Sequence, residues 1–227
     1  MKRKRRVRLT KPKSAIEIRN TIKAVKIVER VLKEMNSPFG RSEADVAKEI
    51  RKRIRDQGAS LSFMPIVASG RNSGFVHHSP GSKIVRESEP VIFDLGAKYN
   101  NCCSDVTRMH VPMTGQDKKA ARIFKHALLI QKKVIGKARP GVELKELHGI
   151  FRNMMKKYGY RVKHLIGHGI GSDVHERIKG KLKPGMVLTV EPGIYKKNYM
   201  GCRIEDMVLI TKGKPKVLSK SIPLMIA

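Results

Sequence analysis

The spacing of apolar residues predicts two pairs of helices, each followed by strands. Over four stretches the apolar residues recur at the period of a helix, with polar residues between them. The predicted helices cover 15–35, 42–58, 117–134 and 143–158. Shorter apolar runs are typical of strands, and these cover 61–69, 91–95, 102–111, 186–191 and 202–210. The halves 14–112 and 113–227 therefore share one order of elements.

Residues that favour helix beginnings and ends support these predicted helices. Ser14 and Glu17 have the spacing of a capping box before the first helix. Asp117 is placed to cap the third helix, and Gly58 closes the second. Two helices followed by sheet in each half favour an α+β fold with internal pseudo-symmetry over a βαβ fold. We expect a basic tail over 1–13 and a single domain over 14–227.

The chain is strongly basic, because its 227 residues carry a formal net charge of +30. The first 13 residues hold eight Lys and Arg and no acid, so the remaining chain still carries +22. Such a surface attracts polyanions, and RNA or ribosome contact is one expectation. The alternative for the tail is a solvated, disordered arm.

Cysteine usage and hydropathy exclude several classes of protein. Cys102, Cys103 and Cys202 fit neither a disulfide framework nor a CxxC zinc site, which favours a reducing, cytoplasmic location. No apolar run approaches the length of a membrane span. The basic N-terminus is not followed by the apolar segment of a secretory signal.

Two aspartates fall on a predicted hairpin within "VIFDLGAKYNNCCSDVTR". If Asn100 and Asn101 form a two-residue turn, Asp94 faces Thr107 across the hairpin. Asp105 then lies on the same face as Asp94, roughly 7–8 Å away at the backbone. Because two buried carboxylates repel each other, we expect a cation between them.

A second pair of carboxylates has a similar setting. "VLTVEPGIY" carries Glu191 and "CRIEDMVLI" carries Glu205, and a hairpin with an odd-length loop centred near Asn198 would bring them face to face. His168 lies in the glycine-rich stretch "GHGIGSDVHE". Four carboxylates and one imidazole suit Mn, Co, Fe or Zn better than a structural thiolate zinc site. Two metals bridged by carboxylates are a known hydrolytic arrangement.

From about residue 15 onward the chain resembles the catalytic domain of the creatinase/methionine-aminopeptidase family of metallopeptidases. The resemblance rests on "FDLG", "SDVTR", "GHGIG", "EPG" and "RIED", in that order. It implies the pita-bread fold, in which each pseudo-symmetric half packs two helices on a curved, mostly antiparallel sheet. It also implies a dinuclear metal site in which Asp105 and Glu205 bridge the ions. The implied ligands are Asp94, Asp105, His168, Glu191 and Glu205.

The forms "CSDVTR", "GHGIGSDVHE", "EPGIY" and "CRIED" are similar to the prolidase and Xaa-Pro aminopeptidase branch. "GRNSGFVHH" resembles the stretch that leads to that branch's first active-site histidine, so His77 is the match and His78 the alternative. The resemblance implies a hydrolase that cleaves the N-terminal bond of peptides, with Xaa-Pro as the expected sequence. His77 would contact the substrate, and His175 would stabilise the oxyanion. Glu191 would also carry the proton.

The resemblance assigns supporting roles as well. Arg203 and Tyr195 would orient the ligands, whereas we expect structural roles for His110, His126, His148 and His164. The expected cofactors are two divalent ions, Mn or Co, with Fe or Zn as alternatives. Two other functions stay open, namely methionine removal from nascent proteins and a basic ribosome- or RNA-binding module of the same fold. Relatives of this branch carry a separate N-terminal domain, so specificity, length limit and oligomeric state stay open too.

Overall fold

The computed structural model describes residues 8–112 and 118–226. The first half contains α1 (Ala15–Glu34), α2 (Glu43–Asp56), β1 (Ser60–Leu61), β2 (Ile66–Ser69), η1 (Gly70–Gly74), β3 (Val91–Leu95), β4 (Ala97–Tyr99), β5 (Cys102–Cys103) and β6 (Val106–His110). The second half contains α3 (Lys118–Ile135), α4 (Leu144–Lys157), β7 (Val187–Val190), β8 (Gly193–Lys196), β9 (Met200–Arg203), β10 (Asp206–Leu209) and β11 (Lys216–Val217). This order confirms the predicted α+β class and the repeated pattern of two helices followed by sheet.

Local signals explain where the helices of the first half begin. The Ser14 hydroxyl accepts a hydrogen bond from the Glu17 amide at 3.3 Å, and the Glu17 carboxylate accepts one from the Ser14 amide at 2.8 Å. The predicted capping box is therefore confirmed. Ser42 caps α2 by accepting from the Asp45 amide at 3.0 Å. The predicted cap at residue 117 lies outside the described residues.

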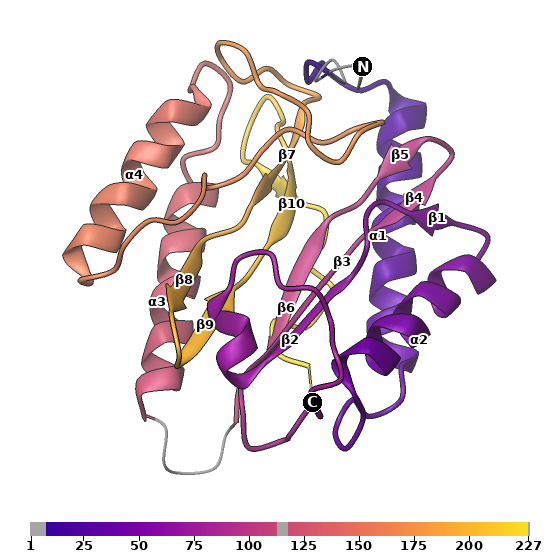
Figure 1. Ribbon diagram of the computed structural model, residues 1–227. Helices are drawn as coiled ribbons and strands as arrows, with labels where there is room; N and C mark the ends of the chain where they lie inside the picture. The colour runs from indigo at the N-terminus through magenta and orange to yellow at the C-terminus, as the bar shows by residue number, and fades with distance from the viewer. Residues whose placement is uncertain (1–7, 113–117, 227) are drawn as a thin grey trace, which may run out of the picture.

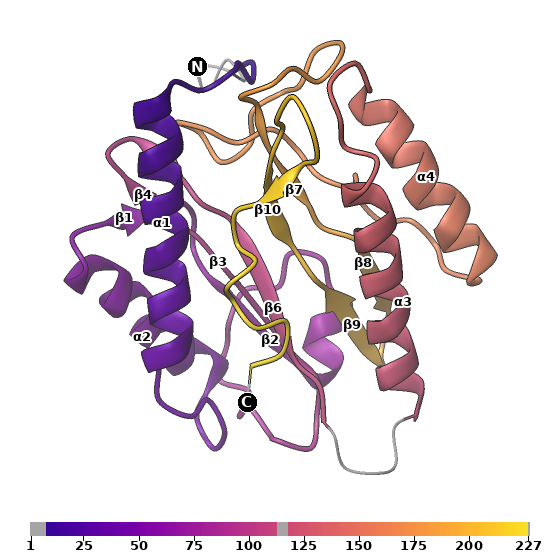
Figure 2. The same cartoon turned by 180° about the vertical axis from the view of Figure 1, so that it is seen from behind.

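The helices lie on the outside and the strands between them. Figure 1 shows α2 and α4 at opposite sides of the strands, and Figure 2, from behind, shows α1 and α3 in front of them. Two apolar clusters fill the space beneath. One packs α1 and α2 against β3 and its neighbours, and the other packs α3 and α4 against β7 to β10. Each helix pair thus has its own core.

The first long hairpin has the predicted register. Tyr99 pairs with Cys102 and Asp94 pairs with Thr107, so paired numbers sum to 201 along its whole length. Asn100 and Asn101 form the turn with φ of 43° and 61°, a left-handed conformation that asparagine tolerates. The predicted continuous strand over 102–111 was wrong, because the hairpin is interrupted after Cys103 and resumes at Val106.

The second long hairpin repeats this design. Gly193 pairs with Arg203 and Val190 pairs with Asp206, so both sections keep one register centred on Asn198. Asn198 itself has a φ of 62°. The hairpin is again interrupted, between β7 and β8 on one strand and between β9 and β10 on the other, where continuous strands over 186–191 and 202–210 were predicted. The predicted strand over 61–69 is likewise confined to β2, with β1 a separate short strand.

The described part of the N-terminal segment packs against the body. The Thr10 amide donates to the Arg177 carbonyl at 3.0 Å, and Lys13 Nζ lies 2.9 Å from the buried carboxylate of Glu176. A solvated arm therefore does not describe residues 8–13. The division into a tail and one domain stays a prediction. None of the described helices has the length and apolar content that a membrane crossing requires.

Candidate metal centre

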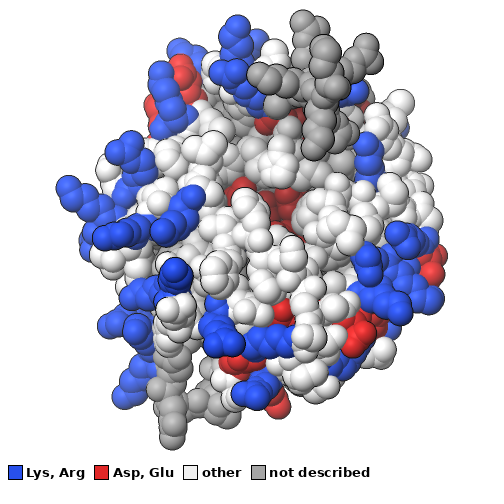
Figure 3. Space-filling model, viewed as in Figure 1, with Lys and Arg blue, Asp and Glu red and all other residues white. Residues whose placement is uncertain are grey.

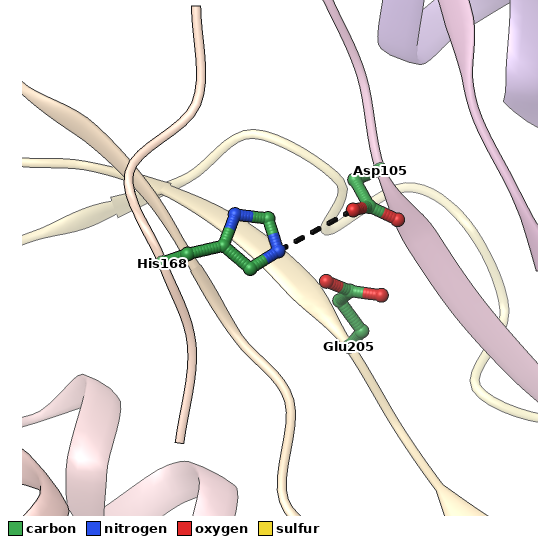
Figure 4. A group of neighbouring side chains, drawn as sticks. All are labelled: Asp105, His168 and Glu205. Carbon is green, nitrogen blue, oxygen red and sulfur yellow. Dashed lines mark ion pairs between the residues drawn. The ribbon is translucent and has the colours of Figure 1, made fainter. Parts of the chain in front are cut away.

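Three of the predicted acidic residues lie in the interruptions of the two long hairpins. Asp105 lies in the gap between β5 and β6, and Glu191 and Glu205 lie in the gaps of the second hairpin, whereas Asp94 lies on β3 and pairs with Thr107 next to the first gap. Asp105 and Glu205 each offer a carboxylate oxygen, and His168 a ring nitrogen, with these three atoms all within 4.8 Å of one another (Figure 4). A broken ladder frees space between the strands, so the carboxylates can turn toward a common centre.

The His168 ring faces the acids. Its Nδ1–H donates to the Gly169 carbonyl at 3.1 Å, which leaves the lone pair on Nε2. Nε2 lies 3.6 Å from Asp105 Oδ2 and 3.5 Å from Glu191 Oε1. The ring is thus fixed in the tautomer that a metal ion requires, with its free nitrogen directed into the carboxylate cluster.

The glycines around His168 permit a close approach to β7. A Cβ added at Gly167 would lie 2.0 Å from the Thr189 carbonyl oxygen, and one at Gly169 would lie 1.6 Å from Thr10 Oγ1. The Thr189 amide donates to the His168 carbonyl at 2.8 Å, so the histidine loop pairs with β7 next to Glu191. The glycine-rich stretch therefore positions the imidazole by tight packing.

Arg203 and Thr107 orient two of the carboxylates. Arg203 Nη2 donates to Asp94 Oδ2 at 2.6 Å, and its Nε donates to Thr107 Oγ1 at 3.2 Å. The Thr107 hydroxyl in turn donates to Glu205 Oε2 at 2.8 Å. Arg203 Nη1 also donates to the Tyr195 hydroxyl at 2.7 Å. One oxygen of each held carboxylate is therefore left to face the centre.

Two of those oxygens show that the cluster is incomplete without a cation. Asp94 Oδ1 and Glu205 Oε1 are buried and have no hydrogen-bond partner among the described residues. A buried carboxylate oxygen without a partner costs several kcal/mol, by order of magnitude, unless a positive charge compensates for it. Oxygen donors with one imidazole are the set that Mn, Co, Fe and Zn accept. The residues present thus fit divalent metal ions.

The electrostatics lead to the same conclusion. Burial and the neighbouring Glu205 and Asp94 raise the pKa of Asp105 well above its usual range. Burial and Glu205 raise the pKa of Glu191, and burial and Asp94 raise that of Glu205 to about 8. Burial and the neighbouring His175 lower the pKa of His168 to about 4, so the ring is neutral. Divalent cations at the cluster would lower these pKa values and keep the carboxylates ionised near neutral pH.

A cavity of about 410 Å³ opens above the cluster, and all five predicted ligands line it. Figure 3 shows acidic atoms at the bottom of a hollow in the centre of this face. His77 and His175 also line the cavity, and the His175 ring centroid lies 4.2 Å from that of His168. His78 instead binds the buried Glu43 at 2.7 Å, which separates the two candidates of the sequence analysis.

Sequence reasoning did not find two further residues of the site. His164, for which we expected a structural role, lines the cavity, and its Nε2 accepts from the Tyr195 hydroxyl at 3.1 Å. Thr107 links Arg203 to Glu205. The signal for His164 was its spacing of four residues before His168 in a segment otherwise poor in helix signals. The signal for Thr107 was its predicted pairing with Asp94.

Buried carboxylates from two pseudo-symmetric hairpins and a histidine from the loop before β7 form the kind of site that metalloenzymes use, and comparisons give the family of the chain. The profile of metallopeptidase family M24 matches residues 19–212. The chain is 37% identical over 220 residues to a Xaa-Pro dipeptidase of Pyrococcus horikoshii, covering 92% of this chain and 62% of that one. It is also 37% identical over 226 residues to one of Pyrococcus furiosus, covering 95% and 64%.

Solved structures agree. A Xaa-Pro dipeptidase from Bacillus anthracis superposes with a TM-score of 0.87 at 33% identity, covering 95% of this chain and 64% of that one. The prolidase from Pyrococcus furiosus gives 0.85 at 36% identity, covering 92% and 65%. The chain belongs to metallopeptidase family M24 and has its pita-bread fold. It spans less than two thirds of the length of these relatives. Membership of this family implies divalent metal ions as cofactors.

Proposed function

We propose that the chain is a metal-dependent exopeptidase that hydrolyses the N-terminal peptide bond of Xaa-Pro peptides. The observation that carries this proposal is the donor set, in which five predicted ligands line one cavity and two buried oxygens lack a partner among the described residues. Two relatives named Xaa-Pro dipeptidase, and the motif forms of the chain, support the proline preference.

Each site residue has a role in this proposal. Asp94, Asp105, His168, Glu191 and Glu205 would hold two divalent ions, which would acidify a water molecule and polarise the scissile carbonyl. Glu191 would take the proton from the water and pass it to the leaving nitrogen. His175 would donate a hydrogen bond to the oxyanion, and His77 would contact the substrate beside the scissile bond.

Arg203 and Tyr195 would position other residues of the site and would not contact the substrate themselves. The Arg203 guanidinium holds Asp94 and contacts the Tyr195 hydroxyl, which donates onward to His164. Burial raises the pKa of Tyr195 to about 12, so its hydroxyl keeps its proton. This chain of hydrogen bonds would hold the Asp94 carboxylate and the His164 imidazole in place during the reaction.

The first experiment is hydrolysis of Met-Pro-Phe and Met-Ala-Ser by purified protein, with added Mn or Co and with chelator. The proposal expects cleavage of the proline peptide alone, abolished by chelator. Cleavage of the alanine peptide alone would assign the chain to methionine removal. Cleavage of neither peptide by protein shown to bind metal would refute an exopeptidase role. Activity with Mn, Co, Fe and Zn in turn tests our proposal that Mn or Co is the physiological metal.

RNA or ribosome contact is a second proposal, supported by the net charge of +30. Binding through phosphate contacts weakens by orders of magnitude between about 50 and 200 mM salt. An RNA affinity that does not change over this range would refute the proposal. A cytoplasmic location is supported by Cys102, Cys103 and Cys202, which are all free and buried. Fluorescence microscopy of the tagged protein in cells would test it.

A further inference from the structure

A second pocket adjoins the proposed active site. It has a volume of about 570 Å³ and shares Val76 with the catalytic cavity. Tyr195, whose hydroxyl contacts Arg203 and His164 of the catalytic cavity, lines this pocket as well. Phe75, 49% exposed, and Tyr160 add apolar surface. The two pockets therefore lie next to each other.

The charged residues of this pocket are all basic. No acid is among its lining residues. The four cations that line it are Arg161, Lys163, Lys196 and Lys197. None of them forms an ion pair with an acid of the described chain. Lys196 Nζ lies 5.6 Å from the centroid of the Tyr160 ring, so at least this cation is held over the pocket wall. Unpaired cations around a concave surface favour an anionic ligand.

The surrounding surface has the same bias. Residues 118–163, which include α3 and α4, hold 14 Lys and Arg but two acids. Residues 15–56, which include α1 and α2, hold 11 Lys and Arg and seven acids, several of them in ion pairs along the helices. Figure 3 shows many basic side chains to the left of the acidic hollow, where Figure 1 places α4, β8 and β9, and further ones at the top, below the hollow and on the right. The excess charge is thus uneven, and it is larger over the segment that leads to Arg161 and Lys163 of this pocket than over the first two helices.

We propose that this pocket is a subsite for a carboxylate of the peptide substrate, beyond the residue whose bond is cleaved. The inference rests on the proposed exopeptidase function and narrows its substrates to peptides that carry a carboxylate within reach of this pocket. The carboxylate comes from a Glu or Asp side chain or from the C-terminus of a short peptide. The shared residue Val76 and the apolar surface favour a peptide over RNA, because a peptide held in the proposed catalytic cavity has this pocket beside it.

The test compares matched peptides. One series is Ala-Pro followed by four residues and a C-terminal amide, with a single Glu or Gln at each position from the third to the sixth. A second pair is the Gln peptide with a free or an amidated C-terminus, which separates the two sources of carboxylate. The proposal expects at least one carboxylate peptide to exceed its neutral match in kcat/KM by about tenfold, the size of two modest ion pairs.

Variants locate the effect. Arg161→Gln/Lys196→Gln should reduce the ratio of kcat/KM between the Glu and Gln peptides to about one. The charge-matched control Lys212→Gln/Lys214→Gln, at exposed positions outside the pocket, should leave that ratio unchanged. Arg161→Glu/Lys196→Glu should reverse the preference toward peptides with Lys at the same position. A loss of simple long-range attraction would affect the control as much as the pocket variant.

The outcomes separate this inference from the proposed function. Cleavage of Glu and Gln peptides at equal rates would overturn the subsite and leave the exopeptidase intact. If no peptide is cleaved, binding of fluorescent Glu and Gln peptides to the metal-loaded protein decides instead, and equal affinities overturn the subsite. Binding of a labelled RNA oligonucleotide that depends on Arg161 and Lys196, without any preference among the peptides, would also overturn it. A pocket-dependent preference for the Glu peptide supports it in either assay.

Discussion

Glu43 offers the most direct test of the structural reasoning, because its side chain is fully buried yet charged. One carboxylate oxygen accepts from the amide and the hydroxyl of Ser69, both at 2.7 Å. The other accepts from His78 Nε2 at 2.7 Å and from the Gly81 amide at 3.4 Å. Asn72 Nδ2 lies 3.1 Å from both oxygens. This one side chain therefore holds together β2, η1 and the loop that follows His77.

The pKa of Glu43 shows which effect prevails. Burial raises this pKa, but the hydrogen bonds from Ser69, His78 and Asn72 outweigh burial, and the pKa lies below its ordinary value. Replacement by alanine would leave several buried donors without an acceptor. Breaking such a buried network costs about 3–5 kcal/mol. Glu43→Ala should therefore lower the free energy of unfolding by that amount, and Glu43→Gln, which keeps one acceptor oxygen, should cost less.

Urea unfolding of the metal-free protein at pH 7, followed by circular dichroism, measures this. The control is Asp45→Ala on the first turn of the same helix, where the exposed carboxylate contacts the Ser42 hydroxyl at 2.6 Å. That replacement should cost about 0.5 kcal/mol, as at other exposed sites. If Glu43→Ala were no more destabilising than Asp45→Ala, the hydrogen-bond network would not contribute as described.

Three further predictions concern pH, packing and metal binding. Burial raises the pKa of Glu49, but amide and arginine partners lower it to about 2. The ionised Glu49 thus stabilises the folded protein by about 1 kcal/mol after screening at pH values above its unfolded pKa of about 4.5. In urea titrations, Glu49→Gln should therefore lower the free energy of unfolding at pH 6 but not at pH 2. Gly167→Ala should cost about 1–3 kcal/mol in the same assay, because its Cβ would strike the Thr189 carbonyl. Asp105→Asn should raise the Tm of the metal-free protein, because it relieves repulsion among the buried carboxylates. It should also abolish the rise in Tm that Mn²⁺ or Co²⁺ gives the unaltered protein. A metal-dependent rise in the variant would contradict the assignment of Asp105 as a ligand.

Register was predictable because turn chemistry is local. Asn100 and Asn101 favour positive φ, and that preference alone fixes which residues face each other along the first hairpin. Pairing across Asn198 followed from the same logic. These turns set the faces on which the four acidic residues lie, so the candidate site could be assembled before any tertiary contact was known.

The interruptions of the hairpins were not predictable, because contacts from distant segments hold them open. At the second break, the buried Gln131 amide of α3 donates to the carbonyls of Val190 and Ile204 at 3.3 and 3.2 Å. These carbonyls lie beside the break, and a helix side chain satisfies them there. The one signal was a polar residue on the apolar stripe of a predicted helix. Without the position of that helix against the sheet, the same glutamine is an ordinary surface residue.

The placement of charge links the two pockets. In a chain with 49 Lys and Arg, the cavity above the candidate metal centre is lined by a single Lys or Arg, Arg203, which is itself paired with Asp94. The adjoining pocket is lined by four cations and no acid. Val76 lines both pockets. Once the proposed metal ions compensate the four carboxylates, the four cations of the adjoining pocket still have no acidic partner among its lining residues, and this matches the proposed carboxylate of the peptide substrate.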